Sequence, residues 1–296
     1  MPGIWHVAAP PWEQDLFVAG AFERTAHVWS LSRAAEVACV GTVFDFGGRR
    51  LALVTGDEPV IVAGAWERHG VCGYSLAGQR IWQNKTRSAV QHVAALASGR
   101  VAVGYARGPA AVLDAATGQE LRSLRGVTGV HALTPEMSLL ASNTYVRLAD
   151  ADLEPMGQRI ALRSFAVLDA AASAHHVAVA EAAGPLRILA LDGAERATHT
   201  VADGRTLTVT HERASGTWRA LTRVDRGDVV DYGLVRLSDD GEVLEQRPFD
   251  ALTDATWLHD GAVLVYGNER GVFLLDAPEE GARRLDLAGT CRQRPD

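Results

Sequence analysis

The chain has 296 residues, of which 29 are Lys or Arg and 36 are Asp or Glu, so its formal net charge at pH 7 is −7. This acidic balance argues against a nucleic-acid-binding surface. No apolar stretch approaches the roughly 18 residues that a membrane-spanning helix needs, and the first six residues have neither the basic nor the apolar region of an export signal. We therefore expect a cytoplasmic protein with no membrane contact.

Cysteine and lysine usage agrees with this expectation. Cys39, Cys72 and Cys291 lie far apart and form no C-x-x-C pair. An odd number of isolated cysteines indicates neither a disulfide framework nor a structural zinc site, so reduced thiols are expected. Lys85 is the only lysine, whereas Arg and Ala are abundant. This bias is typical of a GC-rich bacterial genome.

An apolar residue followed by Asp or Ser closes each of seven similar segments. These pairs are Trp29-Ser30, Tyr74-Ser75, Leu113-Asp114, Ala149-Asp150, Leu191-Asp192, Leu237-Ser238 and Leu275-Asp276. Their spacings are 45, 39, 36, 42, 46 and 38 residues. A period near 40 that fills the chain is typical of a β-propeller, in which each repeat is one four-stranded blade. We therefore predict an all-β, seven-bladed β-propeller with four antiparallel strands per blade.

Within the repeats, pairs of apolar runs separated by short turns predict the second and third strands of each blade. In chain order, the clearest pairs are 16–21 with 26–30, 60–65 with 71–75, 101–104 with 111–114, and 263–267 with 272–276. The runs are too continuously apolar for a sheet with one wet face, and their β-branched content and glycine punctuation disfavour helix. They fit strands that lie between neighbouring blades.

Each repeat also contains a candidate innermost strand upstream. These candidates are 4–8, 51–54, 91–96, 130–134, 164–168, 206–211 and 255–259. The last repeat has its own outer strand near 282–287, so we predict that the first and last blades pack together without the N-terminal strand completing the final blade. The predicted organisation is a single propeller over 4–288, followed by a short tail, 289–296.

Residues 121–135 followed by 139–142, and residues 17–20 followed by Val28-Trp29-Ser30, carry a recognisable pattern. Both stretches resemble the WD-repeat consensus, and the turn 113–120 resembles the related quinoprotein-type repeat. The resemblance extends over about 4–287 and implies a divergent member of this superfamily, because Val127 stands where WD repeats often place His. The chain has no adjacent cysteine pair and is about half the length of quinoprotein dehydrogenases, so no cofactor is expected.

Glu-Arg turns are the strongest candidates for a functional surface. In propellers of this type the turn between the second and third strands lies on the same face as the connections between blades, so these turns would form one rim. Arg and aromatic side chains are enriched at protein interfaces. The candidate partner-binding residues are Phe22, Glu23, Arg24, Trp66, Glu67, Arg68, Tyr105, Arg107, Glu269 and Arg270. The alternative is that they are solvated turns whose weak ion pairs have no binding role.

Motifs for catalysis or metal binding are incomplete. The segment 211–215 begins like a zinc-protease helix but has Ser215 in place of the second His. The segment 150–154 has calcium-like spacing, but Pro155 replaces the required Gly. Propeller enzymes can assemble ligands from inner strands of several blades, and Asp45, His131, Glu136, Asp169, His211 and Asp260 lie near the predicted inner strands. We expect neither a catalytic residue nor a metal.

The sequence therefore favours a non-catalytic scaffold that binds one or more proteins through the top-face loops, within a cytosolic bacterial assembly. The assignment of a scaffold function rests on analogy between folds and on the incomplete catalytic motifs. Two alternatives remain open. One is a small-molecule or metal-dependent hydrolase or lactonase-like enzyme that uses the central channel. The other is carbohydrate or peptide binding on the top face near Trp66.

Overall fold

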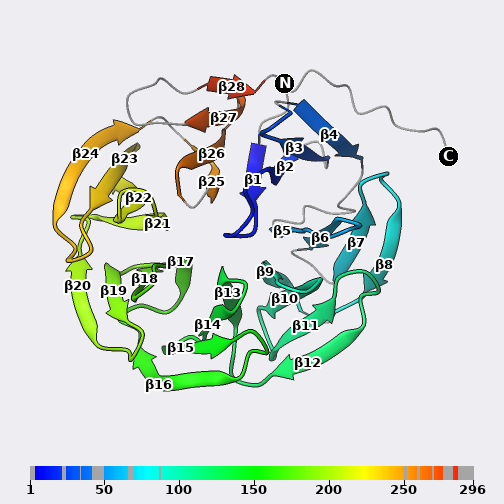
Figure 1. Ribbon diagram of the computed structural model, residues 1–296, viewed down its shortest axis with the longest axis horizontal. Coiled ribbons are helices and arrows are strands. Elements are labelled where there is room, and N and C mark those ends of the chain that lie inside the picture. Colours follow the sequence, from blue (N-terminus) through cyan, green and yellow to red (C-terminus); the bar gives the residue numbers. More distant parts are fainter. Residues whose placement is uncertain are drawn as a thin grey trace. The chain divides into compact units, whose positions relative to one another are not determined.

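The computed structural model describes residues 4–21, 25–33, 35–41, 50–65, 70–86, 88–249, 252–258, 261–268, 270–275 and 283–285. The strands in these residues form seven four-stranded antiparallel sheets, each built from four consecutive strands (Figure 1). The fold is a seven-bladed β-propeller, as the sequence predicted. Within the described ranges, no helix is long and apolar enough to cross a membrane.

The chain divides into two compact units. The first comprises Met1–Val130, Thr253–His259 and Val263–Asp296, and the second comprises His131–Leu252 and Asp260–Ala262. Blades one to three are β1 (Ile4–Ala8), β2 (Leu16–Ala21), β3 (Ala26–Ser30), β4 (Ala35–Val40), β5 (Arg50–Val54), β6 (Val60–Gly64), β7 (Val71–Ser75), β8 (Arg80–Asn84), β9 (Val90–Leu96), β10 (Arg100–Tyr105), β11 (Ala110–Asp114) and β12 (Glu120–Leu124). Blade seven is β25 (Asp254–Leu258), β26 (Val263–Asn268), β27 (Gly271–Leu275) and β28 (Arg283–Leu285).

Blades four to six contain the remaining strands. They are β13 (Gly129–Thr134), β14 (Met137–Ala141), β15 (Tyr145–Asp150), β16 (Pro155–Ala161), β17 (Val167–Ala172), β18 (His176–Glu181), β19 (Leu186–Ala190), β20 (Glu195–His199), β21 (Gly204–Glu212), β22 (Thr217–Arg226), β23 (Val229–Leu237) and β24 (Val243–Phe249). The predicted second and third strands are confirmed within one or two residues. The predicted tail, 289–296, lies outside the described residues.

The hydrophobic core lies between neighbouring blades. In the first unit, Val62 and Val71 of blade two pack in one cluster with Val101 and Val103 of blade three. In the second unit, Ala178 and Ile188 of blade five share a cluster with residues of blade six such as Trp218. Both faces of these middle strands are covered, which explains why their sequences are apolar without alternation.

The Asp or Ser that closes each repeat caps the turn between the third and fourth strands. Its side-chain oxygen accepts a hydrogen bond from a backbone N–H two to four residues later, as Asx and Ser/Thr turns do. The donors and distances are Arg33 to Ser30 (3.2 Å), Gln79 to Ser75 (3.2 Å), Thr117 to Asp114 (2.8 Å), Glu154 to Asp150 (2.8 Å), Ala194 to Asp192 (2.9 Å) and Glu242 to Ser238 (3.1 Å). Asp276 lies outside the described residues. The repeated apolar-Asp/Ser pair in the sequence therefore marks a hydrogen bond that recurs from blade to blade.

A tryptophan joins blade two to blade three within the first unit. The Trp82 Nε1–H of β8 donates to the Ala115 carbonyl at 2.8 Å. Two glycines leave room for its ring: a Cβ at Gly73 would lie 2.3 Å from Trp82 Cε2, and one at Gly118 would lie 2.5 Å from Cδ2. Gly118 also has a φ of +72°, which favours glycine in the capped turn.

The first and last blades pack together as predicted. Strand β1 pairs with β2 as the inner strand of blade one, and β28 pairs with β27 as the outer strand of blade seven. Ile4 and Val7 share a core cluster with Leu258 and Val265. Each of these two blades is thus completed by its own four strands.

One inner strand lies elsewhere than expected. The sequence predicted it at 164–168, whereas β17 spans Val167–Ala172. The backbone N–H groups of Arg163 and Ser164 donate to Glu181 Oε2, both at 2.7 Å. These bonds hold the segment before Val167 in the connection between blades, although Phe165-Ala166-Val167-Leu168 reads as an apolar strand.

Replacing Asp114 with Ala should lower the free energy of unfolding by about 1 kcal/mol, because the Thr117 N–H and Oγ1–H both lose their acceptor. Asp114→Asn keeps an oxygen acceptor and should lose less. Urea denaturation of the three proteins measures this. Equal losses for the Ala and Asn variants would show that the cap does not stabilise the turn.

Replacing Gly73 with Ala should cost about 1–3 kcal/mol of stability, since the new methyl group would overlap the Trp82 ring. The cost should shrink in a Trp82→Ala background, where the ring is gone. Gly56→Ala is the matched control because a Cβ there meets no atom within 4 Å. A double-mutant cycle by urea denaturation measures the coupling between the two positions. Strictly additive effects of Gly73→Ala and Trp82→Ala would contradict a close contact between Gly73 and the Trp82 ring.

Candidate functional site

In both units, the turns between second and third strands lie beside the connections between blades. In the first unit, the Arg107 N–H in the β10–β11 turn donates to Ser88 Oγ at 2.8 Å. In the second, the Ala183 N–H in the β18–β19 turn donates to Ser164 Oγ at 3.0 Å. Ser88 and Ser164 both belong to connections between blades. The expected shared edge of turns and connections is therefore present in each unit.

The structure places three of the ten predicted binding residues. Tyr105 and Arg107 lie at the β10–β11 turn, and Arg270 lies in the turn directly before β27. Both arginines are exposed, whereas Tyr105 packs against the core cluster of blades two and three, and burial raises the pKa of its hydroxyl. Phe22, Glu23, Arg24, Trp66, Glu67, Arg68 and Glu269 lie outside the described residues.

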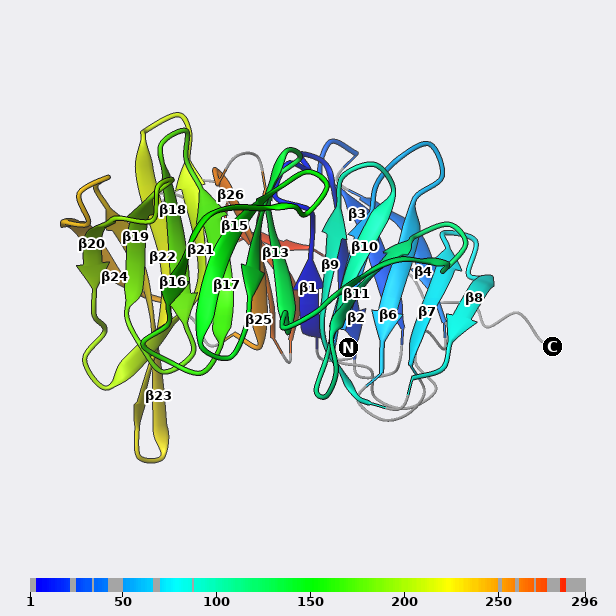
Figure 2. The same ribbon diagram turned by 90° about the horizontal axis from the view of Figure 1, so that it is seen from below.

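Blade six carries the longest hairpin of the described chain. Strands β22 and β23 have 10 and 9 residues, whereas β18 and β19 of blade five have 6 and 5. The ladder of β22 with β21 reaches Val224, and that of β23 with β24 reaches Tyr232. Beyond them, 225–230 form a two-stranded ribbon that projects past the blade-five hairpin (Figure 2). At its tip, Val229 is 57% exposed and Val230 38% exposed.

A tight turn makes this ribbon possible. Gly227 and Asp228 alone connect Arg226 to its cross-strand partner Val229, and Gly227 has a φ of +64°. Two-residue hairpin turns need such positive φ angles, which glycine adopts without steric cost. The exposed valines are therefore held on a regular ribbon instead of an irregular loop.

A buried ion network fixes the connection between blades four and five, 162–166. Glu181 is fully buried, and besides the two backbone N–H groups it accepts a bond from Arg187 Nη1 at 3.0 Å. Arg187 Nε in turn donates to Glu195 at 2.9 Å. The Thr198 hydroxyl and Arg187 lower the pKa of Glu195. Because each charge is paired, the connection is rigid, and it presents Phe165 with 67% of its surface exposed.

Polar residues on inner strands bond to the backbone of another inner strand. Asp169 Oδ2 accepts the Val209 N–H at 2.9 Å, and Asp254 Oδ2 accepts the Val7 N–H at 3.0 Å. His92 Nε2 lies 2.6 Å from the Val130 carbonyl. Asp169 was one of the residues considered as an axial ligand. Through its bond to the Val209 N–H, Asp169 links β17 to β21.

The other residues considered for axial chemistry have local roles where they are described. Glu136 accepts the Thr134 hydroxyl at 3.1 Å in a turn. His211 packs edge-on against Trp218, with ring centroids 4.8 Å apart, and burial lowers its pKa. His131 is buried, while Asp45 and Asp260 lie outside the described residues. The segment 211–215 lies in the β21–β22 hairpin and 150–154 forms a capped turn, as expected.

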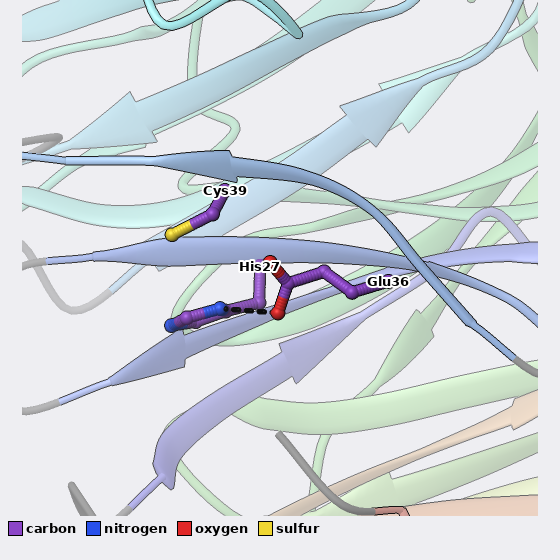
Figure 3. Close-up of side chains that lie close together, drawn as sticks. All are labelled: His27, Glu36 and Cys39. Atoms are coloured by element: carbon purple, nitrogen blue, oxygen red, sulfur yellow. Dashed lines mark hydrogen bonds and ion pairs between the residues drawn. The ribbon is translucent and has the colours of Figure 1, made fainter. Parts of the chain in front are cut away.

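One set of three possible metal ligands occurs in the described part of the chain. His27, Glu36 and Cys39 on β3 and β4 have ligand atoms within 4.8 Å of one another (Figure 3). Both His27 nitrogens are already bonded, Nδ1 to Glu36 and Nε2 to Thr25, each at 2.9 Å. Cys39 is disulfide-bonded, so the prediction of reduced thiols is wrong for this residue. Because the thiolate is the ligand form of cysteine, this set does not fit a metal.

The fold and this edge define a propeller with a candidate protein-binding surface, and known structures share the fold. U3-55K has a TM-score of 0.69 at 12% identity, covering 91% of this chain and 89% of that one. The WD40 repeats of RRP9 have a TM-score of 0.68 at 12% identity, covering 97% and 92%. The computationally designed Ika8 protein has a TM-score of 0.59 at 17% identity, covering 93% and 96%.

These likenesses establish a divergent WD40-like propeller fold and nothing finer, because the identities are low. No family model matches the chain. No curated protein matches it either.

The sequence prediction missed the ribbon and Phe165. The ribbon had a signal: the interval from Asp192 to Ser238, which contains it, is the longest of the six at 46 residues. Phe165 had none, because the bonds that hold its segment outside the sheet come from Glu181, which is 16 residues further along.

Acidification should destabilise the protein through His92. Burial lowers the pKa of His92 from 6.5 to about 4, with smaller contributions from Arg50 and His6. Between these values the unfolded chain takes up a proton that the folded protein refuses, so stability falls as the pH drops from 6.5 to about 4. Relative to His92→Gln, the wild type should lose up to about 3 kcal/mol more over this range.

Urea denaturation at pH 7 and pH 4.5 measures the difference. His175→Gln, which removes an exposed histidine, is the control and should follow the wild type. Parallel losses in the wild type and His92→Gln would contradict a neutral, buried His92.

Proposed function

We propose that this protein is a non-catalytic docking platform that binds protein partners through the edge formed by the second-to-third-strand turns and the connections between blades. The single observation that carries the proposal is the β22–β23 ribbon, which extends beyond its sheet and exposes Val229 and Val230 at its tip. Exposed apolar side chains on a rigid projection contribute little to the fold itself. They would gain free energy when a partner covers them.

The fold supports this proposal through its rigidity. Each described turn at this edge is fixed by backbone pairing on either side, so a partner can contact several turns without a large ordering cost. Phe165 adds an aromatic side chain on a connection that the Glu181 network holds in place. Aromatic residues held in this way are frequent anchors of protein interfaces.

In the first unit, the Glu-Arg turns form the corresponding edge. Arg107 and Arg270 are exposed at two of these turns. The proposed partner-binding set also keeps Phe22, Glu23, Arg24, Trp66, Glu67, Arg68, Tyr105 and Glu269 from the sequence prediction.

We further propose that the platform acts in a multiprotein assembly of the bacterial cytosol. The composition of the chain supports this: one lysine beside abundant Arg and Ala, and a net charge of −7.

Replacing Val229 and Val230 together with Asp should weaken partner capture about tenfold or more, because two charges would be placed in the apolar contact. The measurement is quantitative affinity capture from a lysate of the native host with immobilised wild-type or variant protein. Thermal unfolding of both proteins checks that the variant is folded.

The matched control is Val243→Asp with Leu244→Asp. These residues are 48% and 49% exposed on β24, at the other end of the same sheet. They should leave capture unchanged. Equal capture by the wild type and the ribbon variant would refute the ribbon as a docking element.

A further inference from the structure

Two histidines and one aspartate meet where blade six packs against blade five, within the second unit. Asp239 lies in the β23–β24 turn of blade six. His176 begins β18 of blade five, and His211 lies near the end of β21 of blade six. His176 Nδ1 is 3.5 Å from Asp239 Oδ2, and His211 Nε2 is 3.9 Å from Asp239 Oδ1. One carboxylate thus faces an imidazole from each blade.

Two contacts hold the carboxylate in this position. Trp218 is fully buried, and its Nε1–H donates to Asp239 Oδ1 at 3.0 Å. The turn itself rests on the outer strand of blade five, because a Cβ at Gly241 would lie 2.5 Å from the Cβ of Ala197. Asp239 is therefore kept beside His176 without a hydrogen bond between the two side chains.

The contact between His176 and Asp239 is incomplete. His176 Nδ1 is buried and has no hydrogen-bond partner in the part of the chain that the structure describes. Its 3.5 Å distance from Oδ2 is roughly 0.7 Å longer than a charge-assisted N–H···O bond. A proton on the imidazole would place a positive charge opposite the carboxylate and favour the shorter distance. The buried nitrogen would then gain the partner that it lacks.

His211 has less to gain from a proton. Its ring already has a hydrogen bond to the Gly216 backbone. Burial lowers the pKa of His211, and the charges of His176 and Arg213 act in the same direction, whereas Asp239 opposes them. In mild acid His211 therefore stays neutral, and the pairing with Asp239 falls to His176.

The other charged and titratable groups around this contact are open to solvent. His175 lies next to His176, with ring centroids 6.4 Å apart, and it is exposed. Asp240 and Arg213 are exposed as well. Solvent and salt screen exposed charges more than buried ones, so the buried Nδ1 responds chiefly to the Asp239 carboxylate.

We propose that protonation of His176 in mild acid closes its contact with Asp239 and so latches the β23–β24 turn of blade six onto blade five. The latch lies at the opposite ends of β18 and β23 from the proposed docking edge. It is a pH-sensitive tie between two blades, and it does not depend on the docking function.

Amide hydrogen exchange of the full-length protein at pH 7 and pH 5 tests the latch. An ordinary imidazole takes up a proton between these values and an ordinary aspartate stays ionised. The Gly241 and Glu242 N–H groups donate to Ser238 within the turn, so their protection factors report how often the turn opens. From pH 7 to pH 5, these factors should rise about threefold or more in the wild type relative to His176→Gln.

The equivalent turn of blade five is the internal control. Its Gly193 and Ala194 N–H groups donate to Ala190 and Asp192. Their protection should change with pH equally in the wild type and in His176→Gln. Comparison with this variant also removes the effect of His92, which both proteins share.

Two further variants separate the members of the cluster. Asp239→Asn removes the charge but keeps an oxygen for the Trp218 N–H, and it should abolish the rise in protection. His211→Gln should keep the rise. Near-ultraviolet circular dichroism checks that each variant is folded. An equal rise in the wild type and Asp239→Asn, or a rise that His211→Gln abolishes and His176→Gln does not, overturns the proposal.

Discussion

In six of the seven blades, an Asp or Ser at or just beyond the end of the third strand caps the following turn with a hydrogen bond, and the pairing of the fourth strand depends on this turn. Strand four can pair with strand three only if the chain reverses within a few residues, and the capping oxygen satisfies a backbone N–H that the reversal leaves unpaired. Asp and Ser both supply that oxygen, which is why the two alternate in the repeat. The cap also sets the position of the blade-three turn whose Gly118 accommodates Trp82.

Carboxylates on and beside the strands are in large part used as hydrogen-bond acceptors for the backbone. Asp169 and Asp254 bond to backbone N–H groups of other inner strands, and Glu181 holds two N–H groups of a connection. In a sheet protein with this many strands, connections and strand ends leave many backbone groups unpaired, and buried carboxylates are effective acceptors for them.

Much of the fold could be predicted from the sequence because the signals are local. Continuous apolar runs, turn residues and a repeated capping pair lie within a few residues of the structure that they specify, so the strands appear where expected. The inner strand of blade five was misplaced because a remote carboxylate, Glu181, outweighs the apolar pattern of 165–168. Most of the predicted rim, including Arg68 and Trp66, lies outside the described residues.

Each blade is a continuous stretch of chain, and blade one packs against blade seven without sharing a strand. The blades are therefore modules in the evolutionary sense: a whole blade can diverge, lengthen its hairpin or change its surface while its backbone pairing stays its own. Blades five and six differ in this way: the hairpin of blade six is longer than that of blade five, although the two blades share one core cluster. New binding surfaces can thus arise in one module while selection on the packing between modules preserves the rest.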